Sequence, residues 1–288
     1  MSFLKLVTSA ILQRADRARL TQFKPPALPS CEYSQEHQIS KRHYQHYCQQ
    51  IGWGDQGTLH PCYIQMISTP LQIKCLTTPN SPFPPMGLVH KANKVEQTGI
   101  LDVESSFTIY ASYAAIRAHA RGWEFDIVVT ARQQRQQVYK AVATYLVKAK
   151  APHVEPKKRK SERQTFSLPD KAIKQADFSA GAAQGRQYAR ISGDYNPIHL
   201  SHSTAAIFGF KRAIAHGMWT LARTVSECAN LPNESTGIQV KASFLRPVTL
   251  PSSASCYLIE RSDEKHFYVV SQKKDTPHLT GRIQVKED

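Results

Sequence analysis

The sequence predicts an α+β protein made of two similar halves, and three observations lead to this fold class. The chain has 288 residues, which corresponds to about two domains of ~150 residues each. Each half contains a helix-like segment followed by several runs of strand character, which suggests a sheet wrapped around one helix. Hydrophobic residues make up 41% of the chain, so a core can form and a disordered chain is excluded.

Residues 1–30 are predicted to be an amphipathic N-terminal segment. Apolar residues from Phe3 to Leu12 recur at helical spacing, and basic residues lie among and after them, as in a surface helix or an organelle presequence. Lys5 interrupts the apolar run, so a secretory signal is not expected. The chain has no stretch of about 18 uncharged apolar residues that could span a membrane. We expect a cytoplasmic protein.

Residues 31–148 are predicted to form the first half. A helical pattern over residues 41–51 ends at Gly52, and a second apolar stretch covers residues 62–76. Strand-like runs follow at residues 99–110, 124–132 and 138–147. This order of elements resembles that of the second half only faintly, so the duplication is an inference from order rather than from identity.

A basic segment, residues 149–164, is predicted to link the halves. Residues 148–163 carry seven basic and two acidic side chains, with prolines at Pro152 and Pro156, as expected for a solvated linker. The run Lys157–Lys160 could instead bind nucleic acid. No aromatic residues lie among its charges, so we expect no nucleic-acid partner.

Residues 165–288 are predicted to form the second half. Ser179 is a candidate N-cap for a helix over residues 180–191 that stops at Gly193, and a second helix covers residues 218–229. Four runs of strand character complete the half, at residues 238–246, 255–260, 267–272 and 279–285.

The strongest motif lies between and at the start of these two helices. It reads Tyr188-Ala-Arg-Ile-Ser-Gly-Asp194-Tyr-Asn196-Pro-Ile-His199, followed by Gly209-Phe-Lys-Arg-Ala-Ile-Ala-His216-Gly217-Met218. This sequence resembles the hydratase signature of the MaoC-like family, the (R)-specific enoyl-CoA hydratases and related acyl dehydratases. The segment Phe83-Pro-Pro-Met-Gly-Leu-Val-His-Lys-Ala-Asn93 is similar to members with two fused halves.

The resemblance implies a double hot-dog fold, in which each half is a helix wrapped by an antiparallel sheet. It also implies a thioester substrate carried by coenzyme A or acyl carrier protein, no cofactor, and reversible hydration of trans-2-enoyl thioesters to (R)-3-hydroxyacyl thioesters. In that reading residues 165–288 are the catalytic half and residues 31–148 a degenerate, non-catalytic half that shapes the acyl tunnel. A homodimer of double hot-dog chains is possible in this family.

The residue chemistry supports Asp194 and His199 as the catalytic pair. Addition of water to an enoyl thioester requires one group to take a proton from water and one to deliver a proton to Cα. Asp194 and His199 lie five residues apart, across an Asn196-Pro197 turn that can aim both inward. The alternative is a turn in which Asp194 and Asn196 only cap backbone groups. The sequence does not decide which of the pair is acid and which is base.

Gly217 is predicted to stabilise the enolate. It stands at the start of an apolar helix, where free N–H groups and the helix dipole favour an anion. By the resemblance its N–H is the oxyanion donor. The first half has Pro61 at the corresponding position after His60, and proline has no N–H to donate. His216 could contact substrate or simply order the helix start.

The excess of 37 Lys and Arg over 22 Asp and Glu suits the negative charge of coenzyme A or acyl carrier protein. Lys211, Arg212 and Arg246 are candidate phosphate contacts, and Asn196 and His216 are candidate substrate contacts nearer the reaction. The group His37, His43, His46 and Cys48 matches no zinc-binding spacing, so no metal site is predicted.

Two alternatives remain beside the hydratase. The chain could dehydrate 3-hydroxyacyl groups on acyl carrier protein in fatty-acid synthesis, which is the same chemistry in reverse. It could also be a non-catalytic protein that binds acyl thioesters and keeps the motif as a turn. Chain length, carrier and direction of reaction are not written in the sequence.

Overall fold

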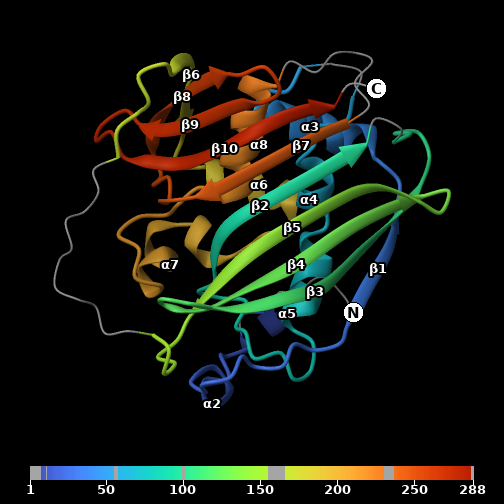
Figure 1. Cartoon of the computed structure of the whole chain (residues 1–288), viewed down its shortest axis with the longest axis vertical. Helices are drawn as coiled ribbons and strands as arrows, with labels where there is room; N and C mark the ends of the chain where they lie inside the picture. Colours follow the sequence, from blue (N-terminus) through green and yellow to red (C-terminus); the bar gives the residue numbers. More distant parts are fainter. Residues whose placement is uncertain are drawn as a thin grey trace.

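A computed structural model describes residues 8–10, 12–54, 58–98, 101–154, 166–229 and 237–286. Within these residues the chain forms one ten-stranded sheet in the order β1-β3-β4-β5-β2-β7-β10-β9-β8-β6. Figure 1 shows the strands of both halves as one continuous surface, with α3, α4, α6 and α8 behind it.

The first half contributes β1 (Glu32–His37), α3 (Lys41–Ile51), α4 (Tyr63–Ile67), α5 (Thr69–Leu76), β2 (Val89–Thr98), β3 (Phe107–His119), β4 (Gly122–Gln133) and β5 (Gln136–Lys148). The second contributes β6 (Ile173–Ala180), α6 (Gln184–Ser192), η1 (Pro197–His199), α7 (His202–Ile207), α8 (Gly217–Cys228), β7 (Gly237–Phe244), β8 (Ser252–Glu260), β9 (Lys265–Ser271) and β10 (Pro277–Lys286). In each half the first strand lies at the outer edge and the second at the centre of the sheet. The predicted duplication is therefore visible in the topology.

The two halves join through the antiparallel pairing of β2 with β7, which runs from Ala92 opposite Ser243 to Thr98 opposite Gly237. Behind the sheet, α8 packs against α3 as well as against the strands of its own half. The indole N–H of Trp219 donates to the carbonyl of Gln50 at 2.9 Å. This contact satisfies a carbonyl at the end of α3, which has no partner within its helix.

Several predicted elements are confirmed. The helix over residues 41–51 is α3, and Gly52 ends it in the left-handed conformation with φ 66°, which glycine adopts without strain. The strands β4, β5, β7, β8, β9 and β10 and the helix α8 lie within a few residues of their predicted bounds.

Other expectations are wrong at particular residues. Ser179 is not an N-cap: it lies in β6, opposite Ser253 of β8, because Phe178 and Ala180 bury alternate positions of a strand. Ala183 is the N-cap of α6, and Gly193 ends that helix as predicted. The stretch over residues 62–76 is two helices that meet at Ser68, with a proline in the first turn of α5, where its missing N–H costs nothing.

Two further differences lie in the first half. Within the run predicted over residues 99–110, the described residues 101–106 are not a strand, and β3 begins at Phe107. Asp102 accepts hydrogen bonds from the N–H of Glu104 and the hydroxyl of Ser105 and holds a turn there. At the N-terminus, a helical turn that includes Thr8–Ala10 is separated by non-helical residues from α2 (Arg17–Leu20).

The rest of the N-terminal segment, residues 1–7 and 11, and most of the basic segment, residues 155–165, lie outside the described residues. No helix among the described residues is both long and apolar enough to cross a membrane.

Candidate active site

The motif residues are held by the end of α6 and the loop that follows it. Gly193 turns the chain with φ 71°, and the N–H of Asp194 then donates to the hydroxyl of Ser192 at 3.2 Å. One turn of η1 lies directly against α6. A Cβ placed on Gly185 would come within 1.8 Å of the carbonyl oxygen of His199, so only glycine permits this approach.

Asn196 stabilises η1 through hydrogen bonds of both its side chain and its backbone. Its side-chain oxygen accepts from the N–H of Ile198 at 3.4 Å, and its own N–H donates to Asp194 Oδ1 at 3.1 Å. The carbonyl of Pro197 accepts from the Thr204 hydroxyl at 2.6 Å. These bonds orient the Asp194 carboxylate and the His199 ring on one rigid turn.

His199 has a defined tautomer in its neutral form. Its Nδ1 lies 2.8 Å from the carbonyl oxygen of Ile214, which can only accept, so Nδ1 carries the proton and Nε2 keeps a lone pair. His216 stacks on this ring at a centroid distance of 3.7 Å and an angle of 27°. Its Nε2 donates to the backbone carbonyl of Asp194 at 3.0 Å and lies 3.8 Å from the carboxylate.

The three side chains therefore form one cluster. One potential ligand atom each of Asp194, His199 and His216 lies within 4.8 Å of the others. His199 is 8% exposed and His216 3%, whereas the Asp194 side chain retains 37% of its surface. The carboxylate is thus the member of the cluster that is open to a small molecule.

Burial determines the charge state of the two imidazoles. Removal from water lowers the pKa of His199 to about 3 and also lowers the pKa of His216 below its ordinary value. Burial alone would raise the pKa of Asp194, but the imidazoles of His216 and His199 and the N–H of Asn196 hold it below its ordinary value. At neutral pH the cluster therefore holds a carboxylate and two neutral rings.

Gly217 is the first residue of α8, and His216 precedes it without a side-chain cap. The N–H groups of the first turn have no acceptor within the helix and carry its positive dipole end. A Cβ on Gly217 would lie 3.1 Å from Cε1 of Phe244. Glycine at this position therefore avoids a tight contact with the ring of Phe244.

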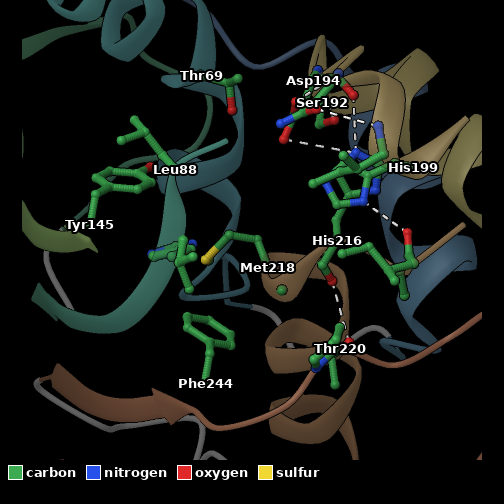
Figure 2. Close-up of a pocket in the computed structure, with 18 of the residues that line it drawn as sticks. Thr69, Leu88, Tyr145, Ser192, Asp194, His199, His216, Met218, Thr220 and Phe244 are labelled. Carbon is green, nitrogen blue, oxygen red and sulfur yellow. Dashed lines mark hydrogen bonds and ion pairs between the residues drawn. The ribbon is translucent and has the colours of Figure 1, made fainter. Parts of the chain in front are cut away.

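The cluster opens into a cavity of about 500 Å³ whose wall comes from both halves of the chain. Figure 2 shows Asp194, His199 and His216 together, with Leu88 and Tyr145 across the pocket and Met218 between the two groups. Thr69, Leu88 and Tyr145 belong to the first half. The sequence analysis gave the first half the general role of shaping the acyl tunnel, but every site residue that it named lies in the second half.

The structure brings most of the predicted site residues together. Asp194, Asn196, His199, His216, Gly217 and Arg246 line the cavity. Lys211 and Arg212 do not belong to its wall and are exposed. The cationic residues of the first half that do line it are Lys91, Arg121 and Lys148. The segment from Phe83 to Asn93, noted for its resemblance, includes Lys91 and His90 and was the only signal in the sequence for this wall.

The cluster also contains side chains of the kinds that coordinate metal ions. Among the described residues, Asp194, His199 and His216 form the group whose donor atoms could hold an ion. The His216 nitrogen nearest the Asp194 carboxylate is Nε2, and it already donates to the carbonyl of Asp194. His43, by contrast, bonds the hydroxyl of Tyr63 and the carbonyl of Ile191, both at 2.9 Å. It serves as a bridge between the two halves.

Comparison with known proteins gives the following relatives. Residues 149–281 match the family described as MaoC like domain. A curated protein, 3-hydroxyacyl-thioester dehydratase X of Mycobacterium tuberculosis (strain ATCC 25618 / H37Rv), is 27% identical over 236 residues, which are 81% of this chain and 81% of that protein. The crystal structure of HtdX of Mycobacterium tuberculosis aligns with a TM-score of 0.74 at 24% identity, over 88% of this chain and 100% of that chain.

A second solved structure bears on the fold. A Mycobacterium tuberculosis protein described as having a double hot-dog fold aligns with a TM-score of 0.56 at 9% identity, over 89% of this chain and 95% of that chain. Together with the repeated strand order, these likenesses confirm the predicted double hot-dog fold.

Proposed function

Residues 149–281 form a MaoC-like domain of the thioester dehydratase and hydratase family, and from this premise we propose that the chain hydrates trans-2-enoyl thioesters reversibly to (R)-3-hydroxyacyl thioesters. Asp194 and His199 are the proposed catalytic pair, and Gly217 is the proposed oxyanion donor. One observation carries the proposal: the Asp194 carboxylate and the Nε2 of His199 that keeps its lone pair lie close together on the wall of one cavity.

The reaction needs one water molecule and no other reactant. The oxygen of that water forms the bond to C3, and its proton is held by Asp194 or His199 before it reaches C2. Both groups present an acceptor atom at neutral pH, because Asp194 is ionised and His199 is neutral with a lone pair on Nε2. Either can therefore begin the proton transfer, and their fixed turn supplies the orientation.

Negative charge develops on the thioester oxygen as water attacks C3. The N–H of Gly217 lies at the N-terminus of α8, which is the positive end of the helix dipole. A donor placed in this way typically lowers such a barrier by about 3–4 kcal/mol.

The first half, residues 31–148, is proposed to bind substrate without catalysing the reaction. Its residues Leu88 and Tyr145 provide one wall of the cavity, and its cations Lys91, Arg121 and Lys148 lie on the same lining. With Arg246 from the second half, these cations favour the phosphates of coenzyme A or the acidic surface of acyl carrier protein.

The test follows the loss of the conjugated enoyl thioester by ultraviolet absorbance, with crotonyl-CoA and a longer enoyl-CoA. We expect turnover by the wild-type chain and a loss of at least ~10²-fold in Asp194→Asn, since general acid–base catalysis typically contributes about 10²–10⁴-fold. Asp170→Asn is the control, because Asp170 is exposed and does not line the cavity. If the folded wild type turns over neither substrate on either carrier, the hydratase proposal is wrong.

Dehydration of 3-hydroxyacyl thioesters is the second candidate, favoured by the name of the relative, a 3-hydroxyacyl-thioester dehydratase. The same groups catalyse both directions, so the distinction concerns carrier and pathway. Rates from (R)- and (S)-3-hydroxybutyryl groups on coenzyme A and on acyl carrier protein separate these possibilities. Turnover of the (S) substrate alone would contradict the proposed stereochemistry.

A further inference from the structure

His90 lies in the cavity wall but takes no part in the proposed catalytic pair. It belongs to β2, in the half proposed to be non-catalytic, and it lines the same cavity as Asp194. Its ring packs against Tyr145 at a centroid distance of 4.8 Å and against Phe244 at 4.6 Å. Phe244 is also the side chain that a Cβ on Gly217 would meet, so His90 lies one ring away from the proposed oxyanion donor.

The hydrogen bonds of His90 leave one acceptor unused. A backbone hydrogen bond with Ala92 raises the pKa of the ring, as a bond donated by a ring N–H to a carbonyl does, and this favours the tautomer whose proton lies on that side. The other nitrogen, Nε2, is buried and has no hydrogen-bond partner among the described residues. Burial lowers the pKa of His90 to about 4, which keeps the ring neutral and its lone pair available at neutral pH.

An unused acceptor in this place is costly for the folded chain. A buried polar atom without a partner destabilises the folded state, and a phenylalanine could pack between the same two aromatic rings without that loss. The polar edge of His90 is therefore explained best by a donor that arrives with the ligand.

We propose that His90 is a specificity-determining residue whose Nε2 accepts a hydrogen bond from an N–H or O–H group of the bound thioester. The inference rests on the proposed function for the identity of that ligand. Two parts of such a substrate carry donors: the amide groups of the pantetheine arm, shared by both carriers, and a hydroxyl group on the acyl chain. Lys91 follows His90 and lines the same cavity, which is consistent with the anionic carrier on this side.

The first experiment replaces His90 by Phe, which keeps an aromatic ring and removes the acceptor. We expect KM for crotonyl-CoA to rise by about 10-fold, the equivalent of one lost hydrogen bond, with kcat changed by less than about 3-fold. The melting temperature should be unchanged or higher, because the unpaired acceptor has gone. His90→Gln, which restores a side-chain acceptor, should recover part of the affinity.

His37→Phe is the matched control. His37 also has a buried Nε2 without a partner among the described residues and also packs on an aromatic ring, that of Phe107 at 5.6 Å. It lies in β1 and does not belong to the cavity wall. We expect His37→Phe to leave KM and kcat at the wild-type values.

Short thioesters identify the donor. The S-crotonyl ester of N-acetylcysteamine keeps the first amide of the arm, whereas S-ethyl crotonothioate has none. A His90→Phe penalty on the first ester and none on the second assigns the bond to the arm. A penalty that appears only when a hydroxyl is added to the acyl chain of the S-ethyl ester assigns it to the acyl group.

Binding of butyryl-CoA separates the inference from the proposed function, because this saturated thioester cannot be hydrated. Weaker calorimetric binding to His90→Phe supports the inference even if the wild type shows no turnover, in which case the proposed function alone fails. Equal butyryl-CoA affinity and equal KM for every thioester in wild type and His90→Phe would overturn the role of His90.

Discussion

The two halves of the chain share the arrangement of their helices and strands, but they differ in the side chains near the end of the first long helix. In both, a helix ends at a left-handed glycine, Gly52 after α3 and Gly193 after α6. In both, a tyrosine lies five residues before that glycine, Tyr47 in the first half and Tyr188 in the second. The same strand order then follows in each half. The backbone alone therefore does not distinguish a catalytic half from a non-catalytic one.

The difference lies in the side chains that follow the glycine. His60 corresponds to His216 in the sequence, but it packs edge-on against Trp53 at 4.6 Å and Tyr47 at 5.6 Å. Its Nδ1 accepts from the N–H of Cys62 at 3.1 Å. His216 also packs against a tyrosine, Tyr188, at 5.0 Å, so the ring that the first half adds beside its histidine is that of Trp53. Under the proposed function, the reaction requires the open space and the free N–H of the second half, and the shared fold alone does not provide them.

Gly217→Pro tests this difference between the halves most directly, because it gives α8 the residue that follows His60. Proline is tolerated at the first position of a helix, and His216 already has the extended ψ of 136° that the residue before a proline requires. The helix should therefore form without the N–H of residue 217. We expect kcat to fall about 10²–10³-fold, measured with crotonyl-CoA.

Gly217→Ala is the control for this variant, because its Cβ meets the same ring of Phe244 while the N–H is kept. The loss in Gly217→Pro beyond that in Gly217→Ala measures the donor. Equal kcat values in the two variants would mean that crowding against Phe244, and not the N–H, accounts for the requirement for glycine.

The first half can be tested through its folding stability, which is expected to depend on the protonation of His60. Burial lowers the pKa of this fully buried ring to about 3, whereas an unfolded histidine titrates near pH 6.5. Below about pH 6.5 the unfolded chain therefore binds more protons, and folding stability falls as the pH falls towards 3. One such group accounts for about 2 kcal/mol of lost unfolding free energy between pH 7 and pH 5.

The measurement is the unfolding free energy from denaturant titration at pH 7 and at pH 5, for wild type and His60→Gln. The variant is expected to be less stable at pH 7 but to lose about 2 kcal/mol less on acidification. His202→Gln is the control, since His202 is exposed at the start of α7 and lies outside the cavity wall. Parallel pH dependences in wild type and His60→Gln would show that His60 can be protonated without unfolding.

Local chemistry explains which parts of the site the sequence could predict. Asp194, Asn196 and His199 lie on one short turn, so their proximity follows from the spacing of a few residues. Gly217 and His216 mark a helix start that apolar periodicity also located. These residues needed no knowledge of distant contacts.

The wall from the first half depends on contacts between distant parts of the chain. His90 and Lys91 reach the cavity because β2 pairs with β7, which is more than 130 residues away in the sequence. The strand itself was missed, since its sequence Val-His-Lys-Ala-Asn-Lys-Val-Glu-Gln-Thr is too polar to give a clear strand signal. Lys211 and Arg212 were favoured by their place next to the motif, and the structure places them on the surface outside the cavity wall.

The rate of the reaction itself is expected to depend only weakly on pH. Because the pKa of His199 is lowered to about 3 and that of Asp194 is also lowered, both groups keep their resting forms throughout the ordinary titration range of histidine. We expect kcat/KM for crotonyl-CoA to vary by less than about 3-fold between pH 5 and pH 8. Samples held at pH 5 and assayed at pH 7 control for the acid loss of stability. An acid limb centred near pH 6.5 would contradict a neutral His199, since it would place an imidazole titration in the free enzyme.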